Sequence, residues 1–178
     1  MRDPDERAAS LAVRHGGAAA VRRAVGWYRR SGRLNVGDEV TMADDALAAW
    51  RADLDAGRDA LLIADRWEVA DPLNERIHRD RIDPDAPTVA AARQHRIAAG
   101  DLIVTRDSDP TIAMRPARAG QPDPAPVRNG NRWEVLDEVD PDNNRLAARR
   151  IGDDAIAVFS GEYLRKHVHL GYVLTVHV

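Results

Sequence analysis

The chain has 178 residues, enough for one compact domain or two small ones. It contains no cysteine, which excludes disulfides, zinc–cysteine sites and thiol catalysis and is typical of a reducing cytoplasm. Its net charge of -3 excludes a globally basic nucleic-acid binder, so any such contact must use a local patch. The N-terminus has no apolar signal segment, and no apolar run approaches the roughly 20 residues of a membrane helix. We therefore expect a cytoplasmic protein that does not bind a membrane.

Helical periodicity predicts three helices in the first third of the chain. Residues 5–14 and 18–30 are separated by a Gly-Gly pair, and a third helix begins at Thr41 and ends at Gly57. The second helix carries arginines that lie mostly off its apolar face: Arg22, Arg23, Arg29 and Arg30. These arginines fit either a solvated helix surface or a patch that contacts nucleic acid.

A buried strand and a further helix follow. Residues 60–64 are all apolar and flanked by charges, which predicts a strand buried on both faces, as in a parallel sheet. Arg66 follows the carboxyl end of this strand, where ligands bind in open α/β sheets. Asp71-Pro72 is typical of an N-cap followed by the first helical residue, so we expect a helix from there to Asp83. No glycine-rich phosphate loop occurs in the sequence, and the chain cannot hold a triphosphate by itself.

The second half of the chain has the pattern of a small β-barrel. A connector over residues 84–99, with one possible helical turn at 89–93, leads into a series of short strands. Asn129-Gly130 is a strong turn signal, and the proline-rich residues 115–126 predict a mobile loop. The expected strands cover residues 102–105, 111–114, 133–139, 145–151 and 155–159. Short strands at this spacing favour a small barrel.

Residues 167–178 alternate between apolar and small or polar side chains, which predicts one strand with a single buried face. Its polar face offers the Thr175 hydroxyl and the His177 imidazole to a ligand. A metal site is the rival interpretation of the histidines on this face, but only His167 and His169 are close enough to share an ion. Two ligands make a weak site, so we predict no metal. No spacing indicates a nucleophile–base pair or paired carboxylates, and we predict no catalytic residue.

Several segments resemble one helicase family. Residues 171–177 resemble the start of motif V of RecD-like superfamily-1 DNA helicases, of the kind found in TraI/TrwC-type conjugative relaxases. Residues 2–9 resemble the segment after motif III, and residues 60–64 with Arg66 and Leu73-Asn74 resemble the motif IV region. Residues 100–104 with the Arg128–Asn131 turn resemble an inserted SH3-like barrel. The resemblance implies an α/β fold with three parts. They are a partial second RecA-like domain over residues 1–98, the SH3-like barrel over 99–166, and a strand over 167–178 that returns to the RecA-like sheet beside residues 60–64.

The resemblance also implies a function for the chain. Such helicases use ATP, bound between two RecA-like domains, to move along single-stranded DNA. The chain lacks the phosphate loop of the first domain, so we expect a helicase fragment that contacts single-stranded DNA without ATPase activity of its own. ATP and Mg would bind only if a companion helicase chain supplied the missing domain.

The same resemblance implies roles for five residues. Arg66 is implied to contact the γ-phosphate when a partner domain holds the nucleotide. Thr175 and His177 are implied to contact the DNA backbone, and Arg128 and Asn129 to line the exit path of the strand. Two alternatives stay open. One is a free-standing SH3-like module that binds protein or nucleic acid, with the helices as its scaffold; the other is a truncated gene product without retained function.

Overall fold

The computed structural model describes residues 3–58 and 60–175. The chain divides into two compact units, residues 1–48 and residues 49–178. This division differs from the grouping of residues 1–98 that we expected from sequence, because residues 49–98 belong to the same unit as the barrel.

The helices of the described residues are α1 (Pro4–His15), α2 (Ala18–Arg30), α3 (Glu39–Asp55), α4 (Trp67–Arg81) and α5 (Gly161–His167), with a 3-10 turn η1 (Ala92–Gln94). The strands are β1 (Leu62–Ala64), β2 (Val89–Ala90), β3 (Arg96–Ile97), β4 (Leu102–Thr105), β5 (Met114–Arg115), β6 (Arg132–Asp140), β7 (Arg145–Arg150), β8 (Ile156–Ser160), β9 (Val168–Leu170) and β10 (Val173–Thr175). The three predicted N-terminal helices are present, whereas α5 was not expected. None of the helices described is long and apolar enough to cross a membrane.

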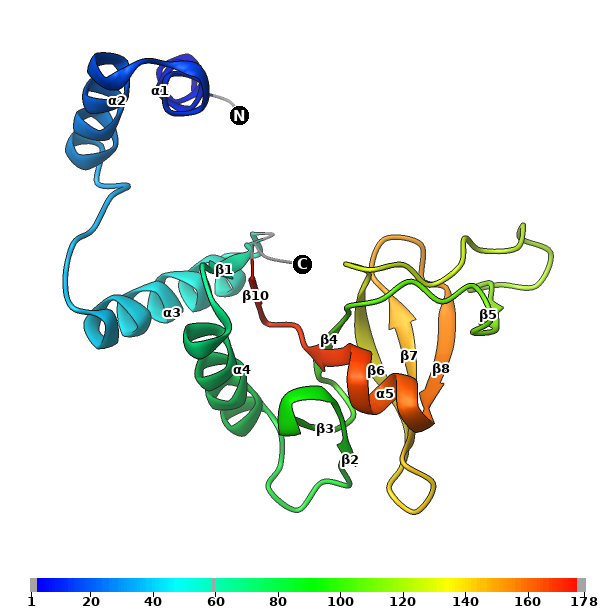
Figure 1. The fold of residues 1–178 in the computed structure, drawn as a ribbon. Helices are drawn as coiled ribbons and strands as arrows, with labels where there is room; N and C mark the ends of the chain where they lie inside the picture. Colours follow the sequence, from blue (N-terminus) through cyan, green and yellow to red (C-terminus); the bar gives the residue numbers. More distant parts are fainter. Residues whose placement is uncertain (1–2, 59, 176–178) are drawn as a thin grey trace. The chain divides into compact units, whose positions relative to one another are not determined.

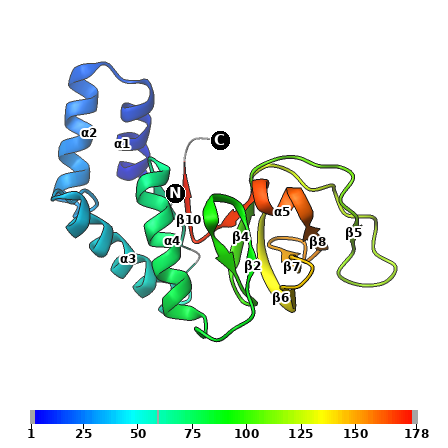
Figure 2. The ribbon, with the colours of Figure 1, turned by 60° about the horizontal axis from the view of Figure 1, so that its bottom comes forward.

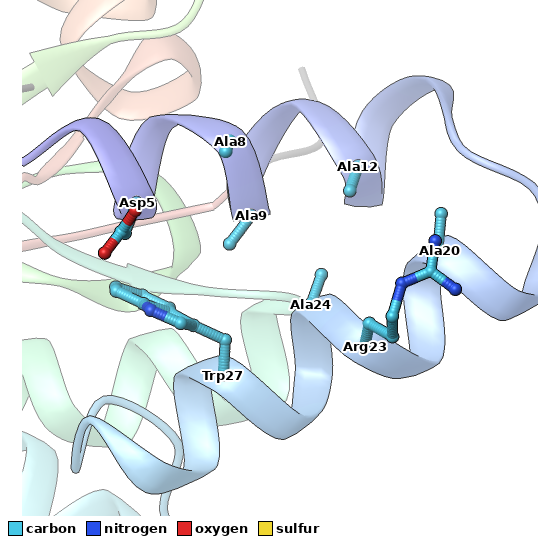
Figure 3. Close-up of a pocket in the computed structure, with 8 residues that line it drawn as sticks. All are labelled: Asp5, Ala8, Ala9, Ala12, Ala20, Arg23, Ala24 and Trp27. Carbon is cyan, nitrogen blue, oxygen red and sulfur yellow. The ribbon is translucent and has the colours of Figure 1, made fainter.

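In the first unit, α1 and α2 form a helical hairpin, and most of the side chains that face each other between the two helices are small (Figure 3). Ala9 and Ala24 are buried where the two helices meet, and alanine side chains let the backbones approach closely. Asp3 caps α1 by accepting hydrogen bonds from the backbone of the first turn. Trp27 lies at one end of the shallow groove between the helices (Figure 3). The arginines of α2 are exposed. A solvated helix surface and a nucleic-acid patch both require this exposure, so both interpretations stay open.

The last strand lies beside the apolar run near residue 62, as predicted. β10 pairs with β1 in parallel, with Leu62 opposite Val173 and Ala64 opposite Thr175. β1 is shorter than expected, and Ile63 is 53% exposed, so the prediction of a strand buried on both faces is wrong. The physical reason is that α4 packs on the β1–β10 pair from one face, whereas the face that carries Ile63 stays exposed.

The buried side chain of Asn74 fixes α4 against β10. Its amide oxygen accepts a hydrogen bond from the Val173 backbone N–H at 2.8 Å, and its amide nitrogen donates to the Val173 carbonyl at 3.0 Å. The side chain thus satisfies the backbone groups that a third strand would otherwise have paired, which buried backbone requires.

Helix α4 begins at Trp67 rather than at the expected Asp71, and Pro72 lies inside it. A proline there removes one hydrogen bond to the preceding turn, a cost that the packing of the earlier residues must offset. Trp67 stacks on His169 with ring centroids 5.1 Å apart, which holds the first turn in place. Asp71 is therefore not an N-cap, and its carboxylate binds Arg93 instead.

The second half forms a curved antiparallel sheet in the order β5-β8-β7-β6-β4-β9 (Figures 1 and 2). Trp133 and Phe159 meet edge to face in its core, with centroids 5.1 Å apart. The expected helical turn at 89–93 is wrong, because the connector forms the hairpin β2–β3 around η1. The expected strand at 111–114 is also displaced, to the two residues of β5.

The predicted single strand over residues 167–178 is two strands, β9 in the barrel and β10 beside β1. Gly171 separates them, because a side chain there would lie 2.7 Å from the Ile103 carbonyl carbon. Only glycine permits this close crossing of two backbones. Residues 176–178, with the predicted site residue His177, lie outside the described residues.

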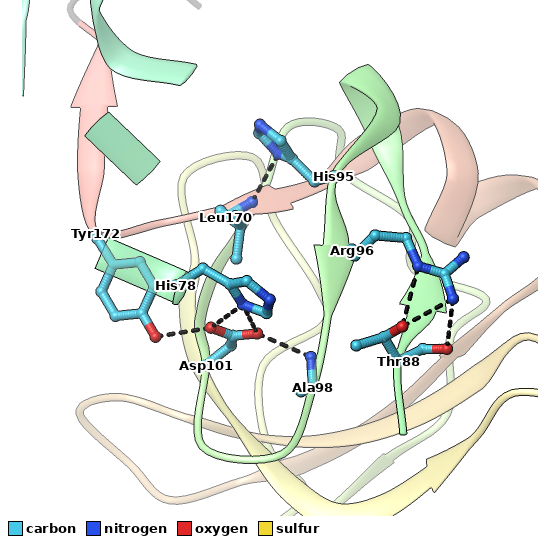
Figure 4. Close-up of polar contacts among 8 residues, drawn as sticks. All are labelled: His78, Thr88, His95, Arg96, Ala98, Asp101, Leu170 and Tyr172. Atoms are coloured by element: carbon cyan, nitrogen blue, oxygen red, sulfur yellow. Dashed lines mark hydrogen bonds and ion pairs between the residues drawn. The ribbon is translucent and has the colours of Figure 1, made fainter. Parts of the chain in front are cut away.

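A fully buried carboxylate, Asp101, joins α4 to the barrel (Figure 4). It accepts hydrogen bonds from the Tyr172 hydroxyl at 2.7 Å, from the Ala98 backbone N–H at 2.8 Å and from His78 Nδ1 at 2.8 Å. Burial, together with the adjacent Asp101 charge, raises the pKa of Tyr172 above its usual range, so its hydroxyl stays protonated and donates. The three donors come from α4, the start of the barrel and the link between β9 and β10, and they hold these segments in one arrangement.

Candidate functional site

The carboxyl ends of the two parallel strands and the start of α4 lie at one end of the β1–β10 pair. Ala64 lies opposite Thr175 at these strand ends, and α4 begins shortly after Ala64. Ligands of α/β proteins bind at such strand ends, and the first turn of a helix offers unpaired backbone N–H groups to anions. Arg66 is the N-cap residue of this 15-residue helix, and its side chain makes no capping hydrogen bond. This end of the sheet is therefore suited to an anionic ligand.

A group of polar and aromatic side chains surrounds Trp67, the first residue of α4. The members of this Trp67 cluster are Trp67, Asp71, Arg93, His95, Arg106, His169 and Thr175. The guanidinium carbons of Arg93 and Arg106 lie 4.9 and 4.8 Å from the centroid of the Trp67 ring. Both distances are within the range of cation–π attraction, so the indole holds two positive charges near one another.

Arg106 is the half-buried cation of the cluster. It directly follows β4, and its backbone N–H donates to the His167 carbonyl at 2.8 Å. Its guanidinium Nη2 donates to the Thr175 hydroxyl at 3.0 Å. Burial lowers the pKa of Arg106, although an arginine remains charged at neutral pH. The side chain is thus a fixed positive charge in a partly desolvated position.

His95 and His169 are buried neutral imidazoles. Burial lowers the pKa of both, and for His169 the nearby His95 and Arg106 lower it further, to about 3. His95 Nδ1 accepts a hydrogen bond from the Leu170 backbone N–H at 3.2 Å (Figure 4). Because that nitrogen accepts, the proton of the neutral ring lies on Nε2. His95 therefore presents an N–H donor toward Asp71, whose Oδ1 lies 3.5 Å from His95 Nε2.

The cluster contains most of the unsatisfied buried polar atoms. Among the described residues, five buried side-chain N or O atoms lack a hydrogen-bond partner, and four of them belong to it. They are Asp71 Oδ1, His95 Nε2, Arg106 Nε and His169 Nδ1. Buried polar groups without partners are rare in folded proteins. Their concentration around one indole makes the Trp67 cluster the candidate site for a polar ligand.

Backbone strain occurs at the same place. Arg93 and Gln94 are adjacent non-glycine residues with positive φ, 55° and 64°. Such conformations are costly and cluster at binding sites. Arg93 is also the outermost member of the cluster, with 39% of its side chain exposed, and its Nε donates to Asp71 Oδ2 at 2.5 Å.

The structure brings some of the sequence-predicted site residues together. Arg66 adjoins Trp67, and Thr175 is buried and bound by Arg106, so both lie at the same end of the sheet. Arg128 and Asn129 are exposed on the barrel turn, where the Asn129 backbone N–H donates to Ser108 Oγ at 3.0 Å. The roles implied for these residues stay predictions.

The remaining members of the Trp67 cluster were not identified from sequence. Arg106 directly follows β4, but β4 is antiparallel to both of its neighbours, so the strand-end rule for parallel sheets does not select it. His95 carries no signal either, because it lies in an irregular connector whose position depends on tertiary structure. Across residues 3–58 and 60–175, no group of three or more His, Asp or Glu side chains is arranged to hold a metal ion.

Comparison with known proteins identifies the barrel. Residues 89–169 match the family model described as the Rv2311 SH3-like barrel domain, so the structure is a mixed α/β fold that contains an SH3-like barrel domain. The matched segment begins at β2, earlier than the expected residue 99. No helicase or relaxase family is matched.

Two curated relatives come from Mycobacterium tuberculosis. They are the uncharacterized protein Rv2311 of strain H37Rv and the uncharacterized protein MT2373 of strain CDC 1551. Each is 45% identical to this chain over 75 residues, which is 42% of this chain and 42% of the relative. The similarity thus spans less than half of the length of either relative.

Proposed function

We propose that residues 49–178 bind the sugar–phosphate backbone of single-stranded nucleic acid at the Trp67 cluster, without catalysing a reaction. The observation that carries this proposal is the position of Arg106. Its guanidinium lies over Trp67 and is bound to Thr175 at the carboxyl end of the β1–β10 pair, while its Nε remains without a partner among the described residues.

Arginine is suited to this task because its planar fork of N–H donors matches the oxygens of a phosphate. Arg106 is already ordered by the Thr175 hydroxyl and the Trp67 ring, so binding costs little additional side-chain entropy. The first turn of α4 adds backbone N–H groups that favour an anion. These contacts recognise a phosphate without reading a base, as expected for a binder that has no sequence preference.

The barrel turn extends the proposed path of the strand. Thr105, the residue before Arg106, donates from its hydroxyl to the Arg128 carbonyl at 2.7 Å, so the turn packs next to the cluster. Arg128 is exposed there and supplies a further positive charge. We propose that the strand runs from this turn, over Arg106, to Arg66 and the first turn of α4.

A finer proposal follows from the family resemblance. The β1–β10 pair with α4 at its carboxyl end would be part of a RecA-like layer, and the chain would be a piece of a RecD-like helicase that contacts single-stranded DNA. ATP and Mg would then require a companion chain with a phosphate loop, because this sequence has none. Arg66 would face the γ-phosphate of that nucleotide.

The test is a titration of fluorescently labelled single-stranded oligonucleotide with the purified chain at two salt concentrations. We expect saturable binding that weakens with salt, with a slope of about -0.7 per phosphate contacted. Arg106→Ala should weaken binding at least about tenfold, the effect of one charged phosphate contact. Arg118→Ala is the matched control, since Arg118 is exposed on the 106–126 loop and should leave binding unchanged.

Two results would contradict the proposal. Absence of binding at low salt would leave the SH3-like barrel as a protein-binding module. An equal loss in Arg106→Ala and Arg118→Ala would mean that net charge, and not the Trp67 cluster, determines binding.

A further inference from the structure

We infer that Asp71 and His95 recognise the 2′-hydroxyl of a ribonucleotide, so that the Trp67 cluster binds RNA more tightly than DNA of the same sequence. This inference rests on the proposed binding of a sugar–phosphate backbone and adds the class of strand; it competes with the finer proposal of a DNA helicase piece.

The unsatisfied atoms of the cluster match a hydroxyl group. Asp71 Oδ1 can only accept a hydrogen bond, whereas His95 Nε2 carries a proton and donates. The two atoms are 3.5 Å apart. One hydroxyl placed beside both can donate to the carboxylate and accept from the imidazole. The C–H bond at the same position of deoxyribose can do neither, and it would leave both buried groups unpaired.

The neighbouring arginines fit the rest of a ribonucleotide. In RNA the 2′-hydroxyl lies next to the phosphate on the adjacent 3′ oxygen. Arg93 and Arg106 both lie within 5 Å of the centroid of the Trp67 ring, so a hydroxyl at Asp71 would place that phosphate near two guanidinium groups. A carboxylate alone would repel a phosphate, but the two guanidinium groups outweigh the single negative charge of Asp71.

Arg93 is the residue that must move for this ligand to enter. It covers Asp71 from the outside, it is 39% exposed, and its backbone has a strained positive φ. When Arg93 turns from Asp71 to the phosphate, the carboxylate loses one donor and the 2′-hydroxyl replaces it. The exchange pairs Arg93 with the phosphate and keeps the Asp71 carboxylate hydrogen-bonded, which buried polar groups require.

The experiment compares oligouridine with oligodeoxyuridine of equal length, since these strands differ only in the 2′-hydroxyl. Fluorescence anisotropy with the full chain should give about tenfold tighter binding of oligouridine, the effect of one hydrogen bond to a charged acceptor. Oligouridine with 2′-O-methyl groups should bind like the deoxy strand, because it cannot donate to Asp71. This comparison needs no protein variant.

Two protein variants then test whether Asp71 is the residue that distinguishes RNA from DNA. Asp71→Ala should abolish the preference for RNA, so that the ratio of the dissociation constants of the deoxy and ribo strands falls to about one. Asp80→Ala removes the same charge from the exposed end of the same helix, where Asp80 pairs with Arg51 on the surface, and it should keep the preference.

The possible failures are distinct. Equal binding of the ribo and deoxy strands, tight binding of the 2′-O-methyl strand, or a preference that persists in Asp71→Ala would each overturn this inference and leave the proposed function standing. Failure of every strand to bind at low salt would overturn both.

Discussion

The guanidinium of Arg106 donates a hydrogen bond to the hydroxyl of Thr175 at 3.0 Å, across a separation of 69 residues. Arg106 directly follows β4 of the barrel, and Thr175 is the last residue of β10, the strand beside β1. The bond therefore joins the barrel to the α/β part of the second unit at the position where Trp67 begins α4.

Thr175→Val should weaken nucleic-acid binding while it changes stability little. Valine keeps the shape of threonine but removes the acceptor for Arg106, so the guanidinium is no longer held at Trp67. We expect a loss of about 1 kcal/mol in binding free energy, measured by anisotropy. Thr111→Val, in an exposed turn where the hydroxyl donates to Asp109, should bind as the parent chain does. Equal affinities in the two variants would show that the bond does not position Arg106.

Asp101→Ala should strongly destabilise the second unit. The change leaves the Tyr172 hydroxyl and the Ala98 backbone N–H, which are both buried, without their acceptor, and it removes the partner of His78. We expect the free energy of unfolding to fall by about 3 kcal/mol or more in urea denaturation. Asp137→Ala, at an exposed position of β6, should change it by less than about 0.5 kcal/mol. A similar small effect at Asp101 would mean that the network does not hold α4 to the barrel.

Gly171→Ala should also be costly, for a steric reason. The added carbon would lie 2.7 Å from the Ile103 carbonyl carbon, which is backbone and cannot turn aside. We expect a loss of about 2 kcal/mol or more in thermal or urea unfolding, as for other overpacked positions. Gly17→Ala is the control, because Gly17 has negative φ and nothing near the added carbon. Comparable stability of the two variants would contradict the close crossing of β9–β10 over β4.

The pH dependence of stability should follow from the buried histidines. The pKa of His169 falls from 6.5 in the unfolded chain to about 3 in the fold, and that of His95 is also lowered. Between these values the unfolded chain binds more protons than the native protein, so stability rises with pH in this window. We expect the free energy of unfolding to be about 2 kcal/mol lower at pH 5 than at pH 7 from His169 alone.

His169→Gln tests the source of this dependence. Glutamine keeps a polar amide in the cluster but does not titrate, so the difference in stability between pH 5 and pH 7 should shrink by most of that amount. An unchanged difference would assign the pH dependence to other groups.

Much of the barrel is predictable from sequence because its signals are local. Asn129-Gly130 and the spacing of the short strands predict the meander, and the structure and the family match confirm a small barrel. The boundary errors have physical causes as well. α4 starts before Asp71 because Trp67 packs on His169, a tertiary contact that overrides the expected proline position. The last strand divides at Gly171 because another backbone passes there, which alternation cannot reveal.

The Trp67 cluster is only partly predictable from sequence, because most of its residues come together only in the folded chain. Arg66 and Thr175 each follow or end a strand, so the rule for ligand sites in parallel sheets selects them. Asp71, Arg93, His95 and His169 become a cluster only when α4, η1 and β9 are packed together. No periodicity or spacing in the sequence predicts these tertiary contacts, because they join segments that are far apart in the chain.

The most direct test of the central claim is a side-chain NMR titration of the labelled chain with single-stranded oligonucleotide. The account predicts that the indole N–H of Trp67 and the Nε–H of Arg106 shift together and saturate with one dissociation constant. The indole N–H of Trp133, which is buried in the barrel core, should stay in place and serve as the internal control. Binding that shifts barrel signals but leaves Trp67 and Arg106 unmoved would contradict the assignment of the nucleic-acid site to the Trp67 cluster.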